Sequence, residues 1–230
     1  MAEVISTQQR ELNAALHQHN DAFGNRHDAA GLATKLPEAL RRMHELGICT
    51  SVLDYGTGKG KLVQRLRAEL PAAIQVQGYD PAVSEFAQRP AQPVDILTCL
   101  DVLEHIEMDS IDAVLREIHA LTRQFCYLVI DLQPAVKTLA DGRNAHILLA
   151  PPEWWTSRLA QLFPCITAFP VYHESGLAQK LVIGAAHRPE VLTLMYAFLI
   201  KLNLFQMRMV QGVLGGMAKG QKKKAAKAKR

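Results

Sequence analysis

Short apolar segments alternate with segments of helical periodicity along the first part of the chain. Four apolar runs have the length and composition of buried strands, at 49–56, 74–80, 94–100 and 125–132. Three segments repeat apolar residues at helical spacing, at 36–47, 61–70 and 110–124. Ser110 is the predicted cap of the last helix. The alternation predicts an α/β fold with a doubly wound, Rossmann-like, mostly parallel sheet and helices on both faces.

Two features depart from a uniform alternation. Residues 166–173 and 179–187 flank a short turn segment, and they predict an antiparallel hairpin at the C-terminal end of the sheet. Only residues 86–93 separate the helix expected after the second strand from the following strand. A third strand of such a sheet is therefore expected to be short or missing.

Both ends of the chain add helices to this pattern. Ile5, Leu12 and Leu16 share one helical face, which predicts a first helix within residues 1–20. Residues 189–216 are apolar nearly all round and predict a C-terminal helix that must bury itself. It would pack on the domain, form the seam of a homodimer or lie on a membrane surface.

Composition and charge divide the chain into a domain and a tail. The 230 residues are 49% hydrophobic and carry a formal net charge of +4, which is typical of a folded domain rather than a disordered chain. Residues 219–230 hold seven basic residues and no acid; without them 19 basic residues face 22 acidic ones, so residues 1–218 sum to −3. We expect residues 217–230 to be disordered, and any contact with nucleic acid or an anionic membrane to belong to them.

The cysteines and the N-terminus indicate the compartment. Four widely spaced cysteines form no CxxC pair, which fits a reducing environment. The N-terminal residues are polar, and no secretory signal is predicted. We expect a cytoplasmic protein.

The most informative segment is SVLDYGTGKGK, residues 51–61, where a strand runs into a glycine-rich turn and a helix. Such a turn lets a nucleotide-type ligand approach bare backbone at the carboxyl end of the strand. A dinucleotide site needs GxGxxG, whereas the spacing here is GxGxG and Asp54 precedes it. A carboxylate there opposes a pyrophosphate and suits the cationic S-adenosylmethionine. Asp80 ends the next strand and suits ribose hydroxyls in either cofactor.

Three segments in order, VLDYGTGKG, GYD and DILTCLDVLEHI, resemble the motifs of class I S-adenosylmethionine-dependent methyltransferases over about residues 20–187. The resemblance implies one domain, residues 1–188, with an N-terminal helical lid that includes Phe23 and Gly24. It also implies a set of cofactor contacts in the turn, at the ribose and near the transferable methyl group: Asp54, Tyr55, Gly56, Gly58, Gly60, Asp80, Leu100, Asp101 and Val102.

The segment LDVLEHI carries candidate acid–base groups, and three interpretations stay open. In the first, Asp101 shapes the cofactor pocket while Glu104 and His105 order the next turn. In the second, His105 acts as a general base. In the third, the acid-x-x-Glu-His pattern binds a divalent cation. The last is similar to metal-dependent small-RNA 2′-O-methyltransferases and ubiquinone-pathway O-methyltransferases, with His146 or His119 as a further ligand. We assign no metal.

The long connection after the fourth apolar run supplies candidate acceptor residues. Asp131 ends that run and points toward the site, Arg143 suits a carboxylate or phosphate, and His146 could be a second base. The expected function is methyl transfer from S-adenosylmethionine to an O or N atom of a small-molecule or sugar-like acceptor. Two alternatives stay open: an RNA methyltransferase, possibly metal-assisted, and a catalytically silent S-adenosylmethionine-binding or assembly module.

Overall fold

A computed structural model describes residues 4–25, 29–173 and 175–200 of the chain. Six strands of this part form one sheet in the order β2-β1-β3-β4-β6-β5. The first four strands are parallel, β6 runs antiparallel to β4, and β5 runs antiparallel to β6. Their bounds are β1 Ser51–Tyr55, β2 Gln75–Tyr79, β3 Val94–Leu100, β4 Thr122–Asp131, β5 Cys165–Tyr172 and β6 Ala178–Ala186. The predicted mostly parallel sheet with a C-terminal antiparallel hairpin is confirmed.

The prediction of a short or missing third strand is also confirmed. Between β2 and β3 the described chain forms a single 3-10 turn, η1 Ser84–Phe86, and no strand. β2 is therefore the edge of the sheet, next to β1 alone.

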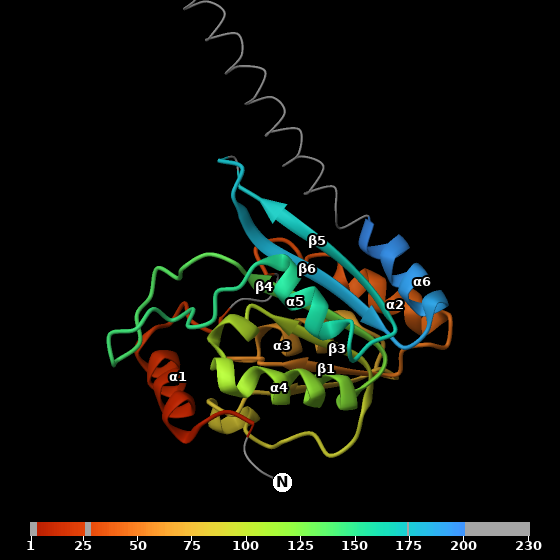
Figure 1. Cartoon of the computed structure of the whole chain (residues 1–230). Helices are drawn as coiled ribbons and strands as arrows, with labels where there is room; N and C mark the ends of the chain where they lie inside the picture. Colours follow the sequence, from red (N-terminus) through yellow and green to blue (C-terminus); the bar gives the residue numbers. More distant parts are fainter. Residues whose placement is uncertain (1–3, 26–28, 174, 201–230) are drawn as a thin grey trace, which may run out of the picture.

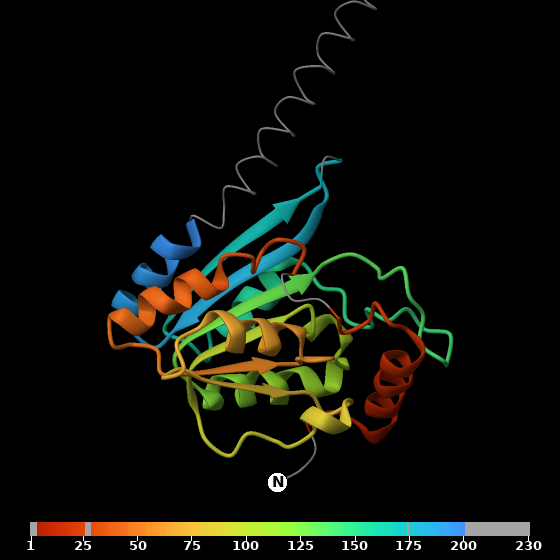
Figure 2. The same cartoon turned by 180° about the vertical axis from the view of Figure 1, so that it is seen from behind.

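Helices cover both faces of the sheet (Figures 1 and 2). One face carries α2 Leu36–Glu45, α3 Lys61–Glu69 and α6 Pro189–Ile200, and the other carries α4 Met108–Leu121 and α5 Pro152–Leu159. Successive strand residues point to opposite faces, so each face has its own hydrophobic core; Val52 and Val129 belong to one, Leu53 and Leu128 to the other. The sheet is thus buried on both sides, as its apolar strands require.

The N-terminal helix α1, Thr7–His19, lies apart from these layers (Figure 1). Its fully buried residues are Gln9 and Asn13, whereas Leu12 and Leu16 are only half-buried and Ile5 precedes the helix. The predicted helix is present, but the predicted apolar face is not its inner face. It covers a polar region rather than a hydrophobic core.

The predicted cap of the fourth helix is wrong. α4 begins at Met108, two residues before Ser110, and its N-cap is Glu107 in an extended conformation. Glu107 is held there because both of its carboxylate oxygens accept hydrogen bonds from Ser6, at 3.0 Å from the backbone N–H and 2.7 Å from the hydroxyl. The residue at the start of this helix is therefore held by a residue 101 positions earlier in the sequence.

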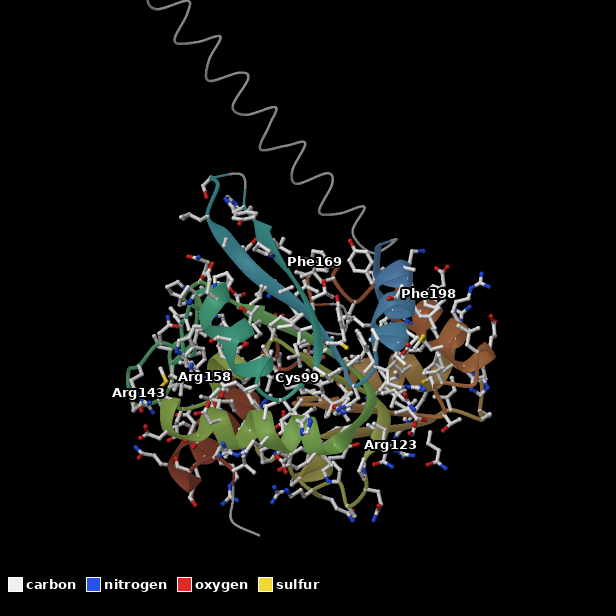
Figure 3. All side chains as sticks on the ribbon, turned by 45° about the vertical axis from the view of Figure 1, so that its right-hand side comes forward. Cys99, Arg123, Arg143, Arg158, Phe169 and Phe198 are labelled. Atoms are coloured by element: carbon white, nitrogen blue, oxygen red, sulfur yellow. The ribbon has the colours of Figure 1, made fainter. Side chains whose placement is uncertain are left out.

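The described part of the C-terminal helix packs on its own domain. In α6, Val191 and Met195 are buried against the core, and the ring of Tyr196 lies 5.5 Å from that of Phe169 on β5. Phe169 and the partly buried Phe198 are labelled in Figure 3. Residues 201–216 of the predicted helix and the basic tail 217–230 lie outside the described residues. Within the described part, none of the helices has the length and hydropathy needed to cross a membrane.

Candidate functional site

A cavity of about 600 Å³ opens at the carboxyl ends of β1, β2, β3 and β4, and residues of α1 form part of its lining. This size is typical of a small-molecule or cofactor site, and the carboxyl edge is where α/β sheets bind ligands. Its walls come from α1, the glycine-rich turn, the ends of β2 and β3, and the loop after β4. Most of the predicted site residues line it: Asp54, Tyr55, Gly56, Gly58, Asp80, Leu100, Asp101, Val102, His105, Asp131 and His146.

The glycine-rich turn forms one wall of the cavity. Gly56, Gly58 and Gly60 have φ values of 76°, 54° and 70°, in the left-handed region that favours glycine. A Cβ on Gly56 would come within 2.3 Å of the Val102 side chain, and one on Gly58 within 2.5 Å of the Gly24 carbonyl oxygen. Gly60 lies outside the cavity lining, at the start of α3. The turn thus packs too tightly against Val102 and Gly24 to accept a side chain at Gly56 or Gly58.

Two buried carboxylates flank this turn. Asp54 accepts a 2.9 Å hydrogen bond from the Thr98 hydroxyl, and burial raises its pKa to about 6. Asp80 accepts N–H groups of Gly58 and Ala82, both at 2.9 Å, and burial raises the pKa of this carboxyl as well. Carboxylates with raised pKa in a cavity are positioned for a cation or for hydroxyl donors.

Tyr55 takes a different role from a simple cavity contact. Its hydroxyl donates a 2.6 Å hydrogen bond to Glu117 on α4, and its ring lies 5.3 Å from that of Tyr79. Burial, followed by the charge of Glu117, raises the pKa of this phenol, so it stays protonated. Tyr55 therefore ties the end of β1 to the helix below it.

Two histidines pack edge to face in the cavity wall, one on η2 Leu103–His105 and one on the loop after β4. The rings of His105 and His146 are 4.9 Å apart. Nδ1 of His105 lies 2.7 Å from the carbonyl oxygen of Ala145, and Nδ1 of His146 lies 2.5 Å from that of Gln133. Because a carbonyl only accepts, each Nδ1 donates its proton in a hydrogen bond to its carbonyl, and each ring directs its Nε2 away from that bond.

The environment keeps His105 neutral. Burial, together with the neighbouring His146, lowers the pKa of His105 to about 3. At physiological pH this side chain is therefore a hydrogen-bond acceptor through Nε2. That state is the one a base or an orienting group for a hydroxyl or amine requires.

Glu104 lies behind these histidines and is fully buried. Oε1 accepts the Asp131 N–H at 3.1 Å, whereas Oε2 has no hydrogen-bond partner within the described residues. Burial and the charge of Asp101 raise its pKa well above the usual range. Ligand atoms of Glu104, His105 and His146 lie within 4.8 Å of one another, so this trio could hold a cation.

Two other residues weighed for a cation in the sequence lie elsewhere in the fold or have other partners. His119 is on α4, with its ring 4.9 Å from Phe163 and 5.0 Å from His187. Asp101 makes an ion pair with Lys180 on β6, at 2.5 Å. The sequence pattern acid-x-x-Glu-His therefore contributes only Glu104 and His105 to the trio, and His146 completes it.

The two predicted acceptor residues differ in position. Asp131 lines the cavity and its carboxylate meets Lys180 at 3.1 Å. The guanidinium of Arg143 donates to Asp141 at 2.7 Å and to Gln9 of α1 at 3.1 Å, and Arg143 does not belong to the described cavity lining. Figure 3 shows it at the outer edge of the molecule. In this structure, Arg143 connects the loop to α1.

The segment before β1 covers the cavity as a lid would. The Lys59 N–H donates to the Gly24 carbonyl oxygen at 2.8 Å, and Gln9 Nε2 reaches the His105 carbonyl oxygen at 3.5 Å. The ring of Phe23 lies 5.2 Å from that of His105. Sequence reasoning missed the inward polar face of α1 and missed Lys180; pairing of β6 with β4 is the signal that would have placed Lys180 beside Asp131.

Comparison with known proteins assigns the family. A model described as a methyltransferase domain matches residues 9–179, more than half of the chain. The chain belongs to this family and is an S-adenosylmethionine-dependent methyltransferase. No curated protein matches the sequence significantly.

Solved structures share the fold. One, titled as a DhpI-SAM-HEP complex, is 18% identical with a TM-score of 0.52 over 82% of this chain and 100% of the other. Another is the 1,6-didemethyltoxoflavin-N1-methyltransferase of Burkholderia thailandensis with 1,6-didemethyltoxoflavin and S-adenosylhomocysteine, 16% identical, TM-score 0.52, over 81% and 92% of the two chains. These similarities establish the fold and do not identify the acceptor.

The residues fit S-adenosylmethionine on the evidence of this site. The glycine-rich turn, held by close packing of Gly56 on Val102 and of Gly58 on Gly24, lines the cavity with backbone atoms. The buried Asp54 suits the cationic methionine end, and the buried Asp80 suits the ribose hydroxyls. Leu100 and Val102 at the end of β3 would lie along the cofactor, as the sequence motifs imply.

Proposed function

We propose that this enzyme transfers the methyl group to an oxygen or nitrogen atom of a small acceptor molecule. The observation that carries the proposal is the cavity itself, which has the glycine-rich turn on one wall and the rings of His105 and His146 on another. When bound, S-adenosylmethionine supplies a methyl group already activated by its sulfonium. The chain's residues have to align the acceptor and exclude water.

The size and cover of the cavity support a small acceptor. Its volume of about 600 Å³ has to accommodate the cofactor and the acceptor together. The lid residues, among them Asn13, His17 and Phe23, form part of its wall. A sugar-like or other small metabolite fits such a covered site better than a polymer does.

His105 is the group we assign to the acceptor. Its Nε2 accepts the hydrogen bond of an acceptor hydroxyl or amine and takes its proton as the new bond to carbon forms. The Nδ1–H bond to the Ala145 carbonyl, 2.7 Å long, holds the ring in the required tautomer. His146 stands beside it with its own tautomer fixed by Gln133.

The test is a labelled-methyl assay on a cell extract separated into metabolites, RNA and protein. We expect label in the metabolite fraction, and His105→Gln to lower kcat about 100-fold with the affinity for S-adenosylmethionine retained. His119→Gln is the matched control, because His119 is a histidine outside the cavity lining. Label in RNA alone would replace the small acceptor by an RNA, and no transfer into any fraction despite cofactor binding would favour the silent binding module.

A second candidate is metal-assisted transfer, and the close approach of Glu104, His105 and His146 favours it. Each histidine presents Nε2 while Nδ1 donates to a backbone carbonyl, the arrangement typical of histidine ligands. Here a chelator is expected to abolish turnover, and added Mn²⁺ or Mg²⁺ to restore it. Full turnover in chelator with metal-free buffers rejects this candidate and leaves His105 as the base.

A further inference from the structure

A lysine on β6 is buried behind two aspartates that line the cavity. Lys180 on β6 is only 4% exposed, and its ammonium lies 2.5 Å from Oδ1 of Asp101 and 3.1 Å from Oδ2 of Asp131. Lysine is rarely buried to this degree without partners. Both partners line the cavity, whereas Lys180 itself is not among the described lining residues.

Strand pairing places Lys180 where it can join three strand ends. Lys180 lies opposite Asp131 in the antiparallel pair of β6 and β4. The Asp101 N–H donates to the Val129 carbonyl oxygen at 2.8 Å, just beyond the parallel pairing of β3 with β4. The ammonium therefore connects the ends of β6 and β4 to the residue that follows β3.

Asp101, the residue that follows β3, has an unusual backbone conformation. Asp101 has a φ of 56°, in the left-handed region that residues with a Cβ rarely adopt. The turn it makes brings Val102 against the Cα of Gly56, so closely that a Cβ there would lie 2.3 Å from the Val102 side chain. The shape of the glycine-rich wall therefore depends on the turn at Asp101.

We propose that Lys180 is a positioning residue of the cofactor site: by binding the Asp101 carboxylate from behind, it holds the left-handed turn that places Val102 against the glycine-rich loop. The inference rests on the assignment of this cavity to S-adenosylmethionine. It goes further by naming a residue outside the cavity, and outside the recognised motifs, that shapes the cavity.

The charges around the lysine support a lasting contact. Burial acts to lower the pKa of Lys180, and the charges of Asp101, Asp131 and Glu104 act to raise it. The net effect is a raised pKa, so the ammonium stays charged. Glu104, whose own pKa is raised by burial, completes the set of ionisable groups that act on it.

The test is cofactor binding by calorimetry, which needs no acceptor. Lys180→Met is expected to weaken S-adenosylmethionine binding by roughly tenfold, the scale of coupling between contacting groups. A second substitution then tests whether any loss of affinity comes from the released Asp101 carboxylate or from an unbalanced negative charge in general. Asparagine adopts the left-handed region as aspartate does and carries no charge that needs a tether, so Lys180→Met with Asp101→Asn is expected to recover most of the affinity. Lys180→Met with Asp131→Asn is expected to stay weak, because the Asp101 carboxylate still lacks its tether.

The outcomes distinguish the two levels of inference. If the wild-type chain fails to bind S-adenosylmethionine, the proposed function falls. If the wild type binds S-adenosylmethionine and Lys180→Met binds it equally well, the positioning role is wrong. It is also wrong if Lys180→Met with Asp131→Asn recovers as much affinity as Lys180→Met with Asp101→Asn. Thermal melting monitors folding of each variant; should Lys180→Met not fold, the same pair of second substitutions is compared on Lys180→Gln.

Discussion

Two buried aspartates lie on the neighbouring strands β3 and β1, Asp95 at the amino end of its strand and Asp54 at the carboxyl end of its strand, and their pKa values shift in opposite directions. Asp95, near the start of β3, accepts the Thr50 N–H at 2.8 Å and the Thr50 hydroxyl at 2.7 Å, and lies 3.6 Å from Arg123. Burial acts to raise its pKa, but these partners outweigh it and the pKa is lowered. Asp54, near the end of β1, has the Thr98 hydroxyl at 2.9 Å, and burial raises its pKa to about 6. Figure 3 labels Arg123 at the side of the molecule opposite Arg143.

The difference shows how one sheet divides stability and function between its two ends. At the amino end the chain supplies a full set of partners, so the negative charge of Asp95 stabilises the fold. At the carboxyl end the chain buries Asp54 with the Thr98 hydroxyl and no cationic side chain among its described contacts, and its charge becomes favourable when a cation enters.

The largest expected effect comes from neutralising the functional carboxylate. Asp54→Asn should weaken S-adenosylmethionine binding by roughly 100-fold, because a buried charge-assisted contact contributes about 3 kcal/mol. Isothermal titration calorimetry measures the change. Asp95→Asn is the matched control and should bind S-adenosylmethionine as the wild type does. Equal losses of affinity in both variants would contradict a specific role of Asp54 in cofactor binding.

A smaller effect is expected on the free energy of unfolding, and here the substitution of Asp95 should matter more than that of Asp54. Asp95→Ala should lower the free energy of unfolding by about 2 kcal/mol, because it leaves the Thr50 N–H and hydroxyl without their acceptor. Asp54→Asn should lower it little or raise it, since it removes a buried charge. Urea unfolding curves of both variants decide between these outcomes, and a larger loss in Asp54→Asn would contradict them.

The dependence on pH follows from the direction of each shift. Only ionised Asp54 attracts the cationic end of the cofactor, so affinity should rise about tenfold per pH unit below pH 6 and level off above it. The folded state of Asp54 binds its proton more tightly than the unfolded state, so its contribution to stability falls as pH rises from about 4 to 6. Asp95 acts in the opposite sense: its stabilisation is present above its unfolded pKa and is lost as pH falls through the lowered folded pKa.

Titrations at several pH values check the binding curve. In Asp54→Asn the rise with pH should disappear, whereas in Asp95→Asn it should persist. A slope that survives in Asp54→Asn would assign the titration to another group, with Asp80 the first to examine.

The smallest effect is expected at Arg143. Its guanidinium is about half exposed and contacts Asp141 and Gln9, a kind of contact that contributes about 0.5 kcal/mol. Arg143→Ala should therefore change the KM for either substrate by no more than about threefold. Steady-state kinetics with an identified acceptor provides the measurement; a much larger rise in the acceptor KM would restore the anion-binding role that the sequence suggested.

Much of the architecture was predictable because it depends on local pattern. The alternation of apolar runs and helices defines the parallel sheet, the short 86–93 connection predicts the missing third strand, and GxGxG preceded by Asp54 selects the cofactor. The features that were missed depend on tertiary contacts. Ser110 is not the cap because the helix begins two residues earlier, after a Glu107 that Ser6 contacts, and Lys180 becomes informative only once β6 is paired with β4.

The N-terminal helix teaches the same lesson in another way. Periodicity assumes that a helix packs on a hydrophobic core, and so it placed Leu12 and Leu16 inward. α1 instead covers the cavity, with Gln9 donating to Asn13 at 3.1 Å. His105 and His146 were each named as candidates, but their approach to 4.9 Å depends on how the loop after β4 folds back.

The meeting of two glycines has a consequence for anyone redesigning this enzyme. Gly24 of the lid and Gly58 of the loop touch through bare backbone, since a Cβ on Gly24 would lie 3.2 Å from the Gly58 Cα. A side chain at Gly58 would collide with the Gly24 backbone and one at Gly24 with His17, so both positions are restricted to glycine. Libraries aimed at a new acceptor should leave this pair fixed and place their diversity at Asn13 and Gln133, which line the cavity away from it.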